Sequence, residues 1–229
     1  GSFYQLGLNK NGGGVTRFSV GYQYLSPGFE INDIGFLSRA NGQNQYVWYA
    51  VQLRTPTKLY RQWQTNFNQW TNWTSDGLRQ ELGGNINSHM TLKNNMSLHF
   101  GQGGNALAPS YCDNCARGGV AVRQSRSLWG WAGVEGDNRH AVVPFFFTRW
   151  SKGDEGRSGG FGIDPSLTIK VASRFSTNLG ISYSHDINDA QWYGNIGDVT
   201  TDTAHVTFAR LDQRSVSASV RVNYTVSPT

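Results

Sequence analysis

The sequence predicts an all-β protein, an antiparallel transmembrane β-barrel of the outer-membrane type. Three observations support this fold class: apolar and polar residues alternate with a period of two, connections alternate between tight and long, and charge is scarce. Of the 229 residues, 15% are charged and 13% are aromatic, and 28 are Gly. An ordinary soluble domain has roughly 25% charged residues. A disordered chain, which is rich in charge and poor in aromatic residues, is therefore excluded.

Hydropathy and charge placement exclude two further classes. No apolar run approaches the length of about 18 residues that a membrane-spanning helix needs, and the mean hydropathy is −0.48. The 20 Lys and Arg residues exceed the 15 Asp and Glu residues by a net charge of +5. They are dispersed along the chain and form no basic run, so we expect no nucleic-acid partner.

The period-two pattern is clearest at 215–226, where Val216, Ala218, Val220 and Val222 alternate with Ser, Arg and Asn residues. Similar segments are longer than the usual globular strand of about 5 to 6 residues and approach the roughly 9 to 11 of a tilted membrane strand. In a barrel, the apolar side chains would face lipid and the polar ones a hydrated interior. The other segments with this pattern are 15–24, 46–54, 82–92, 161–171 and 179–184.

Connections along the chain alternate in length. Tight turns are predicted at 11–14, 55–58, 93–95, 135–138 and 173–177. Long loops are predicted after four aromatic residues, which are Tyr24, Trp73, Phe100 and Trp150. Outer-membrane barrels have short periplasmic turns, long external loops and aromatic girdles at the strand ends. The sequence therefore predicts that these four aromatic residues stand at the membrane interface.

Counting segments gives about 13 strands, with four strands at 178–226 separated by turns at 188–190, 200–203 and 212–215. An odd number of strands does not close a single-chain bacterial barrel in the usual way. We therefore expect residues 1–229 to be a single barrel domain, or a segment of a larger barrel, with no separate soluble domain. A missing part of the same chain or another envelope protein would complete the sheet.

Inward-facing basic residues would line a mildly basic lumen. The candidates are Arg17, Arg54, Lys170 and Arg221. Alternation alone also fits a soluble β-sandwich, whose polar faces meet bulk water. In that alternative, a carbohydrate-binding module would stack sugars on Trp63, Trp70, Trp73 and Trp192.

No motif points to catalysis, a cofactor or a metal. Cys112 and Cys115 form a C-x-x-C pair without the second ligand pair that a zinc site needs. A loop disulfide is the favoured interpretation in an oxidising envelope, followed by free thiols and then by metal binding. The five His residues are scattered over different predicted strands, so no metal site and no cofactor are expected.

The predicted loop after Tyr24 contains a compact motif. Its residues Phe29, Glu30, Asp33 and Phe36 mix aromatic and acidic side chains. We expect the aromatic residues to pack the loop onto the barrel and the carboxylates to satisfy backbone donors in its turns. Two carboxylates at this spacing also fit acid/base chemistry or Ca²⁺ binding, which we rank well below the structural role.

The chain resembles the DUF5916 family of bacterial proteins over nearly its whole length. The resemblance implies an outer-membrane β-barrel region, which in family members typically follows an N-terminal carbohydrate-binding family 9-like domain. Residues 1–229 do not include that domain or the further strands that the resemblance implies after residue 229. The residues that carry the resemblance are Ser26, Pro27, Phe29, Glu30, Asn32, Asp33, Gly35, Phe36 and Leu37, together with Leu211, Asp212 and Gln213.

These observations predict a protein of the bacterial outer membrane whose partner is the lipid bilayer. It would act as a passive porin-like channel, or as a scaffold or docking component of an envelope assembly. Two alternatives remain: the soluble carbohydrate-binding module and, less favoured, a membrane-associated hydrolase. The hydrolase rests only on labels given to some family members, because the sequence contains no catalytic motif.

Overall fold

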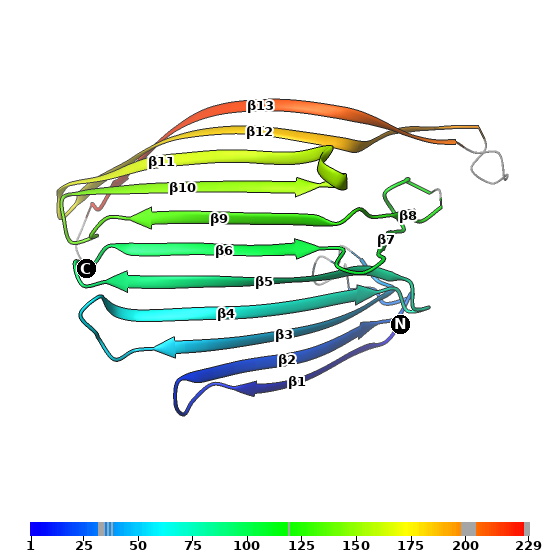
Figure 1. Cartoon of the computed structure of the whole chain (residues 1–229), viewed down its shortest axis with the longest axis horizontal. Helices are drawn as coiled ribbons and strands as arrows, with labels where there is room; N and C mark the ends of the chain where they lie inside the picture. Colours follow the sequence, from blue (N-terminus) through cyan, green and yellow to red (C-terminus); the bar gives the residue numbers. More distant parts are fainter. Residues whose placement is uncertain (32–34, 36, 38, 119, 198–204, 227–229) are drawn as a thin grey trace.

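A computed structural model describes residues 1–31, 35, 37, 39–118, 120–197 and 205–226. The described chain has 13 strands, and eleven of them form one antiparallel sheet (Figure 1). The predicted all-β antiparallel class and the count of about 13 strands are confirmed. The eleven strands are β1 (Phe3–Lys10), β2 (Thr16–Leu25), β3 (Gly42–Leu53), β4 (Tyr60–Trp73), β5 (Arg79–Leu92), β6 (Ser97–Asn105), β9 (Ser127–Glu135), β10 (Val142–Gly153), β11 (Ser158–Ala172), β12 (Phe175–Ile196) and β13 (His205–Tyr224).

The sheet is a meander in which each strand pairs with its neighbours in the chain. All five predicted tight turns therefore lie at one end of the sheet, which we call the short-turn end (Figure 1). The opposite end, the loop end, carries the segment 106–126 with the small strands β7 (Tyr111–Cys112) and β8 (Val122–Arg123), and the 3-10 turn η1 (Asp154–Gly156). Within the described residues, β1 and β13 pair on one side only, so the sheet is not closed.

The predicted division of 178–226 into four strands is wrong. The structure has two long strands there, β12 with 22 residues and β13 with 20. The expected turn at 188–190 is a bulge, because the register shifts between Asn188 and Gln191 while pairing continues on both sides. The expected turn at 212–215 lies inside the ladder, where Asp212 pairs with Ile187. A long paired neighbour thus overrides local turn preferences.

Phe100 was predicted at a strand end, and this prediction is wrong. It lies in the middle of β6, which continues to Asn105. The glycines after Phe100 stay extended because indole rings of β9 cover them. A Cβ atom at Gly101 would lie 2.8 Å from the Trp131 ring, and one at Gly103 would lie 2.5 Å from the Trp129 ring. Aromatic side chains that cover glycines of a neighbouring strand stabilise that register.

The sheet has almost no protein interior. The buried apolar residues among those described are Ala50, Met90, Ala106, Ala116 and Val143. The accessible surface is 14774 Å², whereas a compact protein of this mass would expose about 10,300 Å². No second sheet covers either face of the described sheet. None of the described helical segments is long and apolar enough to cross a membrane.

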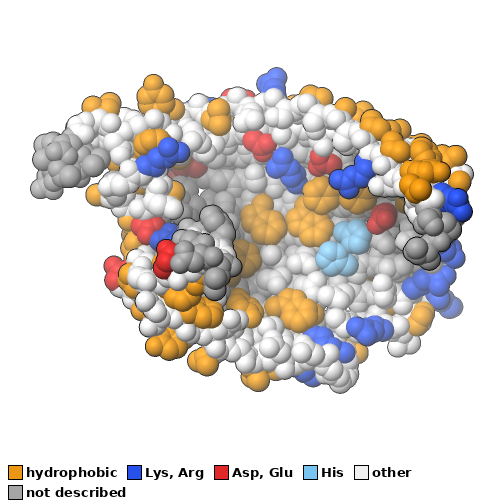
Figure 2. All heavy atoms as spheres, turned by 180° about the vertical axis from the view of Figure 1, so that it is seen from behind, with side chains coloured by type: hydrophobic (Ala, Val, Ile, Leu, Met, Phe, Trp, Pro, Cys, Tyr) orange, Lys and Arg blue, Asp and Glu red, His pale blue; other side chains and the backbone are white. Residues whose placement is uncertain are grey.

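The two faces of the sheet differ in chemistry because side chains alternate along each strand. One face is apolar and exposed: Ile181, Val216 and Val220 are 60%, 76% and 72% exposed. The other face carries polar and aromatic side chains and surrounds a hollow, in which Figure 2 shows His side chains beside hydrophobic ones, with charged side chains nearby. Residues 216, 218, 220 and 222 do not point into a dry interior between two stacked sheets. We call the two faces the apolar face and the concave face.

The β12–β13 register can be tested with engineered cysteines in a Cys112→Ser, Cys115→Ser background. Ser184 and Ser215 are register partners, and directly opposed Cβ atoms lie roughly 4.5–5.5 Å apart. We expect Ser184→Cys with Ser215→Cys to form a disulfide on mild oxidation, seen as a shifted band in non-reducing electrophoresis. The control pair Ser184→Cys with Ser219→Cys should remain reduced, because Ser219 pairs with Gly180. Equal cross-linking of both pairs would contradict the register.

Candidate functional site: the concave face and the loop across its mouth

A ladder of hydrogen-bonded amide side chains covers the concave face of β3, β4 and β5. Asn66 is its centre: it accepts hydrogen bonds from Trp48 Nε1 at 3.1 Å and from Gln64 Nε2 at 2.7 Å. Asn66 also donates to Asn87 Oδ1 at 2.8 Å, and Asn68 donates to Asn85 Oδ1 at 2.8 Å. The ladder gives the hollow a surface of uncharged donors and acceptors that is held in place by its own hydrogen bonds.

Glu81 places one carboxylate at the loop end of this ladder. It accepts hydrogen bonds from Trp70 Nε1 at 2.8 Å and from Asn72 Nδ2 at 2.9 Å. Asn72 also accepts from Asn44, so β3, β4 and β5 are linked at this level. A carboxylate with two oxygens can accept further bonds. Glu81 is therefore fixed in position and is still able to accept a hydrogen bond from a hydroxyl group.

His89 and His99 face each other across β5 and β6 at the short-turn side of the ladder. Their Nδ1 atoms are 2.8 Å apart, and His89 Nε2 lies 3.2 Å from Asn87 Oδ1. The Trp131 ring lies 6.0 Å from His89 and stacks on Phe147. No group of three or more His, Cys, Asp or Glu residues in the described ranges could hold a metal ion. The pair joins the amide ladder to an aromatic patch on β9 and β10.

The segment 106–126 crosses the mouth of the hollow at the loop end. On one side, Asp113 forms an ion pair with Arg39 and accepts a hydrogen bond from Gln80 at 2.9 Å. On the other side, Asn195 donates to the Ala116 carbonyl at 2.9 Å, and the Arg117 guanidinium lies 4.5 Å from the ring of Trp192 on β12. Strands β6, β9, β10 and β11 lie between β5 and β12 in the sheet. The segment therefore spans the hollow.

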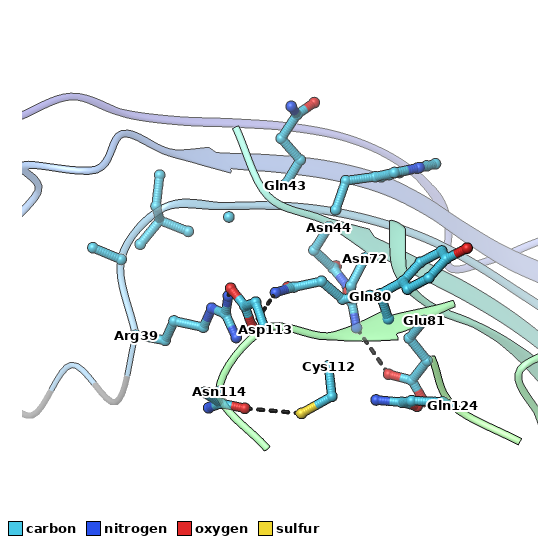
Figure 3. A pocket seen from close by; sticks show the side chains of 15 residues that line it. Arg39, Gln43, Asn44, Asn72, Gln80, Glu81, Cys112, Asp113, Asn114 and Gln124 are labelled. Carbon is cyan, nitrogen blue, oxygen red and sulfur yellow. Dashed lines mark hydrogen bonds and ion pairs between the residues drawn. The ribbon is translucent and has the colours of Figure 1, made fainter. Parts of the chain in front are cut away.

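A disulfide joins Cys112 to Cys115 in this segment. It closes the turn that carries Asp113, the residue that contacts both Arg39 and Gln80. A cavity of about 460 Å³ lies between this turn and the ladder. Figure 3 shows Gln80 pointing toward Asp113, and Asn72 toward Glu81. The polar residues that line the cavity include Asn44, Asn72, Gln80, Glu81, Tyr111, Asn114 and Gln124.

The four predicted lumen residues share the polar side of their strands but lie toward the short-turn end. Arg17 follows the first tight turn and donates to the carbonyls of Gly13 and Gly14. Arg54 directly follows β3, and Lys170 lies two residues before the end of β11. Arg221 pairs with Asn178 near the start of β12. The structure thus places them near one end, while uncharged side chains dominate the middle of the concave face over β3–β6.

The predicted loop motif is only partly within the described residues. Phe29 packs against Phe3 of β1, with ring centroids 5.7 Å apart, and its amide donates to the Ser26 carbonyl. Glu30 is exposed. Asp33 and Phe36 lie outside the described residues. The contact of Phe29 agrees with the predicted packing of this loop onto the sheet.

The four tryptophans of the sugar-binding alternative do not form one platform. Trp63 and Trp73 share the apolar face of β4. Trp70 lies on the concave face, because it is three positions before Trp73 and alternate residues of a strand point to opposite faces. Trp192 is on β12 and contacts Arg117. Three further tryptophans, which were not predicted as site residues, also line the hollow: Trp48, Trp129 and Trp131. The period-two alternation of their strands could have placed these rings on the concave face.

The amide ladder should contribute measurably to stability through Asn66, which is 7% exposed. Asn66→Ala would leave the part-buried Trp48 Nε1 without its acceptor, and the loss of a partner for a buried donor costs about 1–3 kcal/mol. We expect a lower urea midpoint in detergent micelles, followed by Trp fluorescence. Asn9→Ala, at an exposed position on the same face of β1, is the matched control and should leave the midpoint nearly unchanged. Equal midpoints for the two variants would show that the ladder is not structural.

Comparison with known proteins gives one family. The family model described as "Domain of unknown function (DUF5916)" matches residues 1–229. Neither the curated proteins nor the solved structures contain a match to the chain. The match spans every strand and loop described above, and the resemblance inferred from the sequence is confirmed: the chain belongs to the DUF5916 family.

Proposed function

We propose that this chain forms part of the wall of an outer-membrane β-barrel that encloses a passive route for uncharged polar solutes. The observation that carries this proposal is the opposite chemistry of the two faces. The apolar face is exposed along the sheet, and the concave face carries a hydrogen-bonded polar lining. Lipid outside and water inside would solvate these two faces in the way each requires.

The exposed apolar side chains argue for lipid contact. Leu6, Leu8 and Ile181 are each at least 60% exposed, and they lie on strands at opposite sides of the sheet. Soluble monomers rarely expose contiguous apolar patches beyond a few hundred Å². A soluble sandwich would cover such a face with a second sheet, and the described residues contain no such layer.

Backbone hydrogen bonding sets a condition on this proposal. In hydrocarbon, every N–H and C=O group must be paired, so membrane-spanning sheets are closed. The nine inner strands of the sheet are paired on both sides. The outer edges of β1 and β13 would need further strands to pair with them in the bilayer. In the usual orientation, the short-turn end would be periplasmic and the loop end external.

The lining of the hollow favours uncharged polar solutes. Its centre carries Asn and Gln side chains and indole N–H groups, which exchange hydrogen bonds with hydroxyl-bearing molecules. The segment 106–126 narrows the external mouth, and Glu81 stands beside the cavity that remains. Selection would follow from the width of the passage and from hydrogen bonding, without a catalytic step.

Two lysine substitutions on adjacent residues of β12 test the membrane assignment. Ile181 lies on the apolar face and Ser182 on the concave face. A Lys on the lipid face near the bilayer centre costs about 2–4 kcal/mol, whereas a Lys on the inner face is tolerated. We expect Ile181→Lys to lower the folded fraction in phosphatidylcholine vesicles strongly, and Ser182→Lys to lower it little, as measured by protease protection.

Equal effects of the two substitutions, or a folded monomer in buffer without lipid or detergent, would overturn the membrane assignment. The same vesicles separate a route for solutes from a scaffold. Release of a trapped uncharged sugar by the inserted wild-type chain would support the route. Insertion without release would overturn it and leave a scaffold role.

A further inference from the structure

The short-turn end of the sheet is strongly basic. The segments at this end are 10–17, 54–61, 93–96, 135–141 and 170–174, and their only acidic residues are Glu135 and Asp137. Figure 2 shows Lys and Arg side chains gathered at one end of the molecule. We call the nine basic residues of these segments the basic rim: Lys10, Arg17, Arg54, Lys58, Arg61, Lys93, Arg139, Lys170 and Arg174.

The charge of the basic rim is largely uncompensated. Arg139 forms an ion pair with Asp137 at 2.6 Å, and its hydrogen bonds hold the pKa of Asp137 well below the usual range. Other rim residues contact neutral oxygens: Lys10 donates to Thr16 Oγ1, and Arg61 donates to the Lys93 carbonyl. Neutral acceptors orient a cation but do not cancel its charge. No other ion pair to an acid involves the basic rim in the described ranges.

Basic residues at the loop end behave differently. Arg39 pairs with Asp113, and Arg157 pairs with both Asp154 and Asp189. Arg210 also lies 3.4 Å from Asp189. Part of the positive charge at the loop end is therefore paired with acids, whereas Arg139 is the one member of the basic rim with such a pair in the described ranges. The excess of positive charge at the short-turn end attracts a polyanion or an anionic surface to that end.

Exposed apolar side chains border the basic rim. Leu59 and Val171 are 63% and 67% exposed, and Val15 and Val142 are each half exposed. Each lies within one or two residues of a rim residue or a rim turn in the sequence. Cations directly beside an apolar band fit the boundary between acyl chains and headgroups, where long basic side chains reach the phosphates. A soluble acidic partner would not need the apolar border.

We propose that the basic rim, through the residues in its turns and not through Arg17, Arg54 and Lys170 on the concave face, binds the phosphate groups of anionic phospholipids in the leaflet at the short-turn end. This inference rests on the proposed function, because it requires the apolar face to be immersed in a bilayer. The bound lipids would fix the depth of the sheet in the membrane and favour one orientation. Several cations at the same depth act together. Each cation that lies within a Debye length of an anionic membrane surface adds to the attraction.

The test measures how strongly the full chain binds vesicles of phosphatidylcholine alone or mixed with phosphatidylglycerol, by flotation at low and high salt. We expect about tenfold tighter binding to the mixed vesicles at low salt, and a much smaller difference at high salt. The rim variant is Lys58→Gln, Lys93→Gln, Arg174→Gln, in which all three residues are exposed. It should lose most of the preference for phosphatidylglycerol.

The matched control removes three charges at the loop end, with Arg123→Gln, Arg126→Gln and Lys152→Gln, which are also exposed. It should keep the preference, and both variants should keep the wild-type urea midpoint. Equal loss in both variants would mean that only net charge matters and would overturn the proposal. Equal binding of the wild type to both vesicles would overturn it as well, while leaving the membrane assignment intact. Failure to insert into either vesicle would instead contradict the proposed function.

Discussion

No layer formed by the described residues covers the apolar face of this sheet, and the rest of the account depends on that constraint. Side chains alternate along each strand, so apolar ones gather on one face and polar ones on the other. The two faces therefore need different solvents. Val216 and Val220 on the apolar face of β13 are largely exposed, while Asn66 on the concave face of β4 is buried. The usual order of a soluble protein, apolar inside and polar outside, is reversed in this region.

This reversal explains where the structure finds its stability. The five buried apolar residues in the described part of the chain cannot supply the hydrophobic driving force of a domain of this size. Backbone pairing along eleven strands and side-chain hydrogen bonds on the concave face hold the sheet together. Aromatic rings add to this by covering glycines, as Trp131 covers Gly101. On the proposed account, the remaining stabilisation comes from the transfer of the apolar face into lipid.

Local sequence predicted the strands well where alternation was strong, and less well where distant contacts decide the outcome. The alternation at 215–226 predicted strand structure, which residues 215–224 have as part of β13, but the turn signals at 188–190 and 212–215 were overridden by the long pairing of β12 with β13. Phe100 was expected at a strand end because Gly residues follow it. Those glycines pair with residues of β5 and β9, and the rings of Trp129 and Trp131 on β9 cover Gly103 and Gly101.

The candidate site was predictable in kind but not in arrangement. The polar side of the segment 82–92 followed from alternation, whereas the position of segment 106–126 across the mouth did not. Its contacts join Asp113 to Arg39 and Ala116 to Asn195, pairs that are distant in the sequence. Single-residue patterns carry no information about such pairs. For the same reason, the gathering of dispersed basic residues at one end became visible only with the topology.

A nitroxide scan along 215–222 of the chain in phosphatidylcholine vesicles tests the central claim most directly. Each position would be labelled through a single cysteine in a Cys112→Ser, Cys115→Ser background, and collisions with oxygen and with a polar nickel chelate would be measured. The account predicts that positions 216, 218, 220 and 222 collide mainly with oxygen, and the positions between them mainly with the chelate. A scan without this alternation, or with the even positions shielded from both, would contradict it.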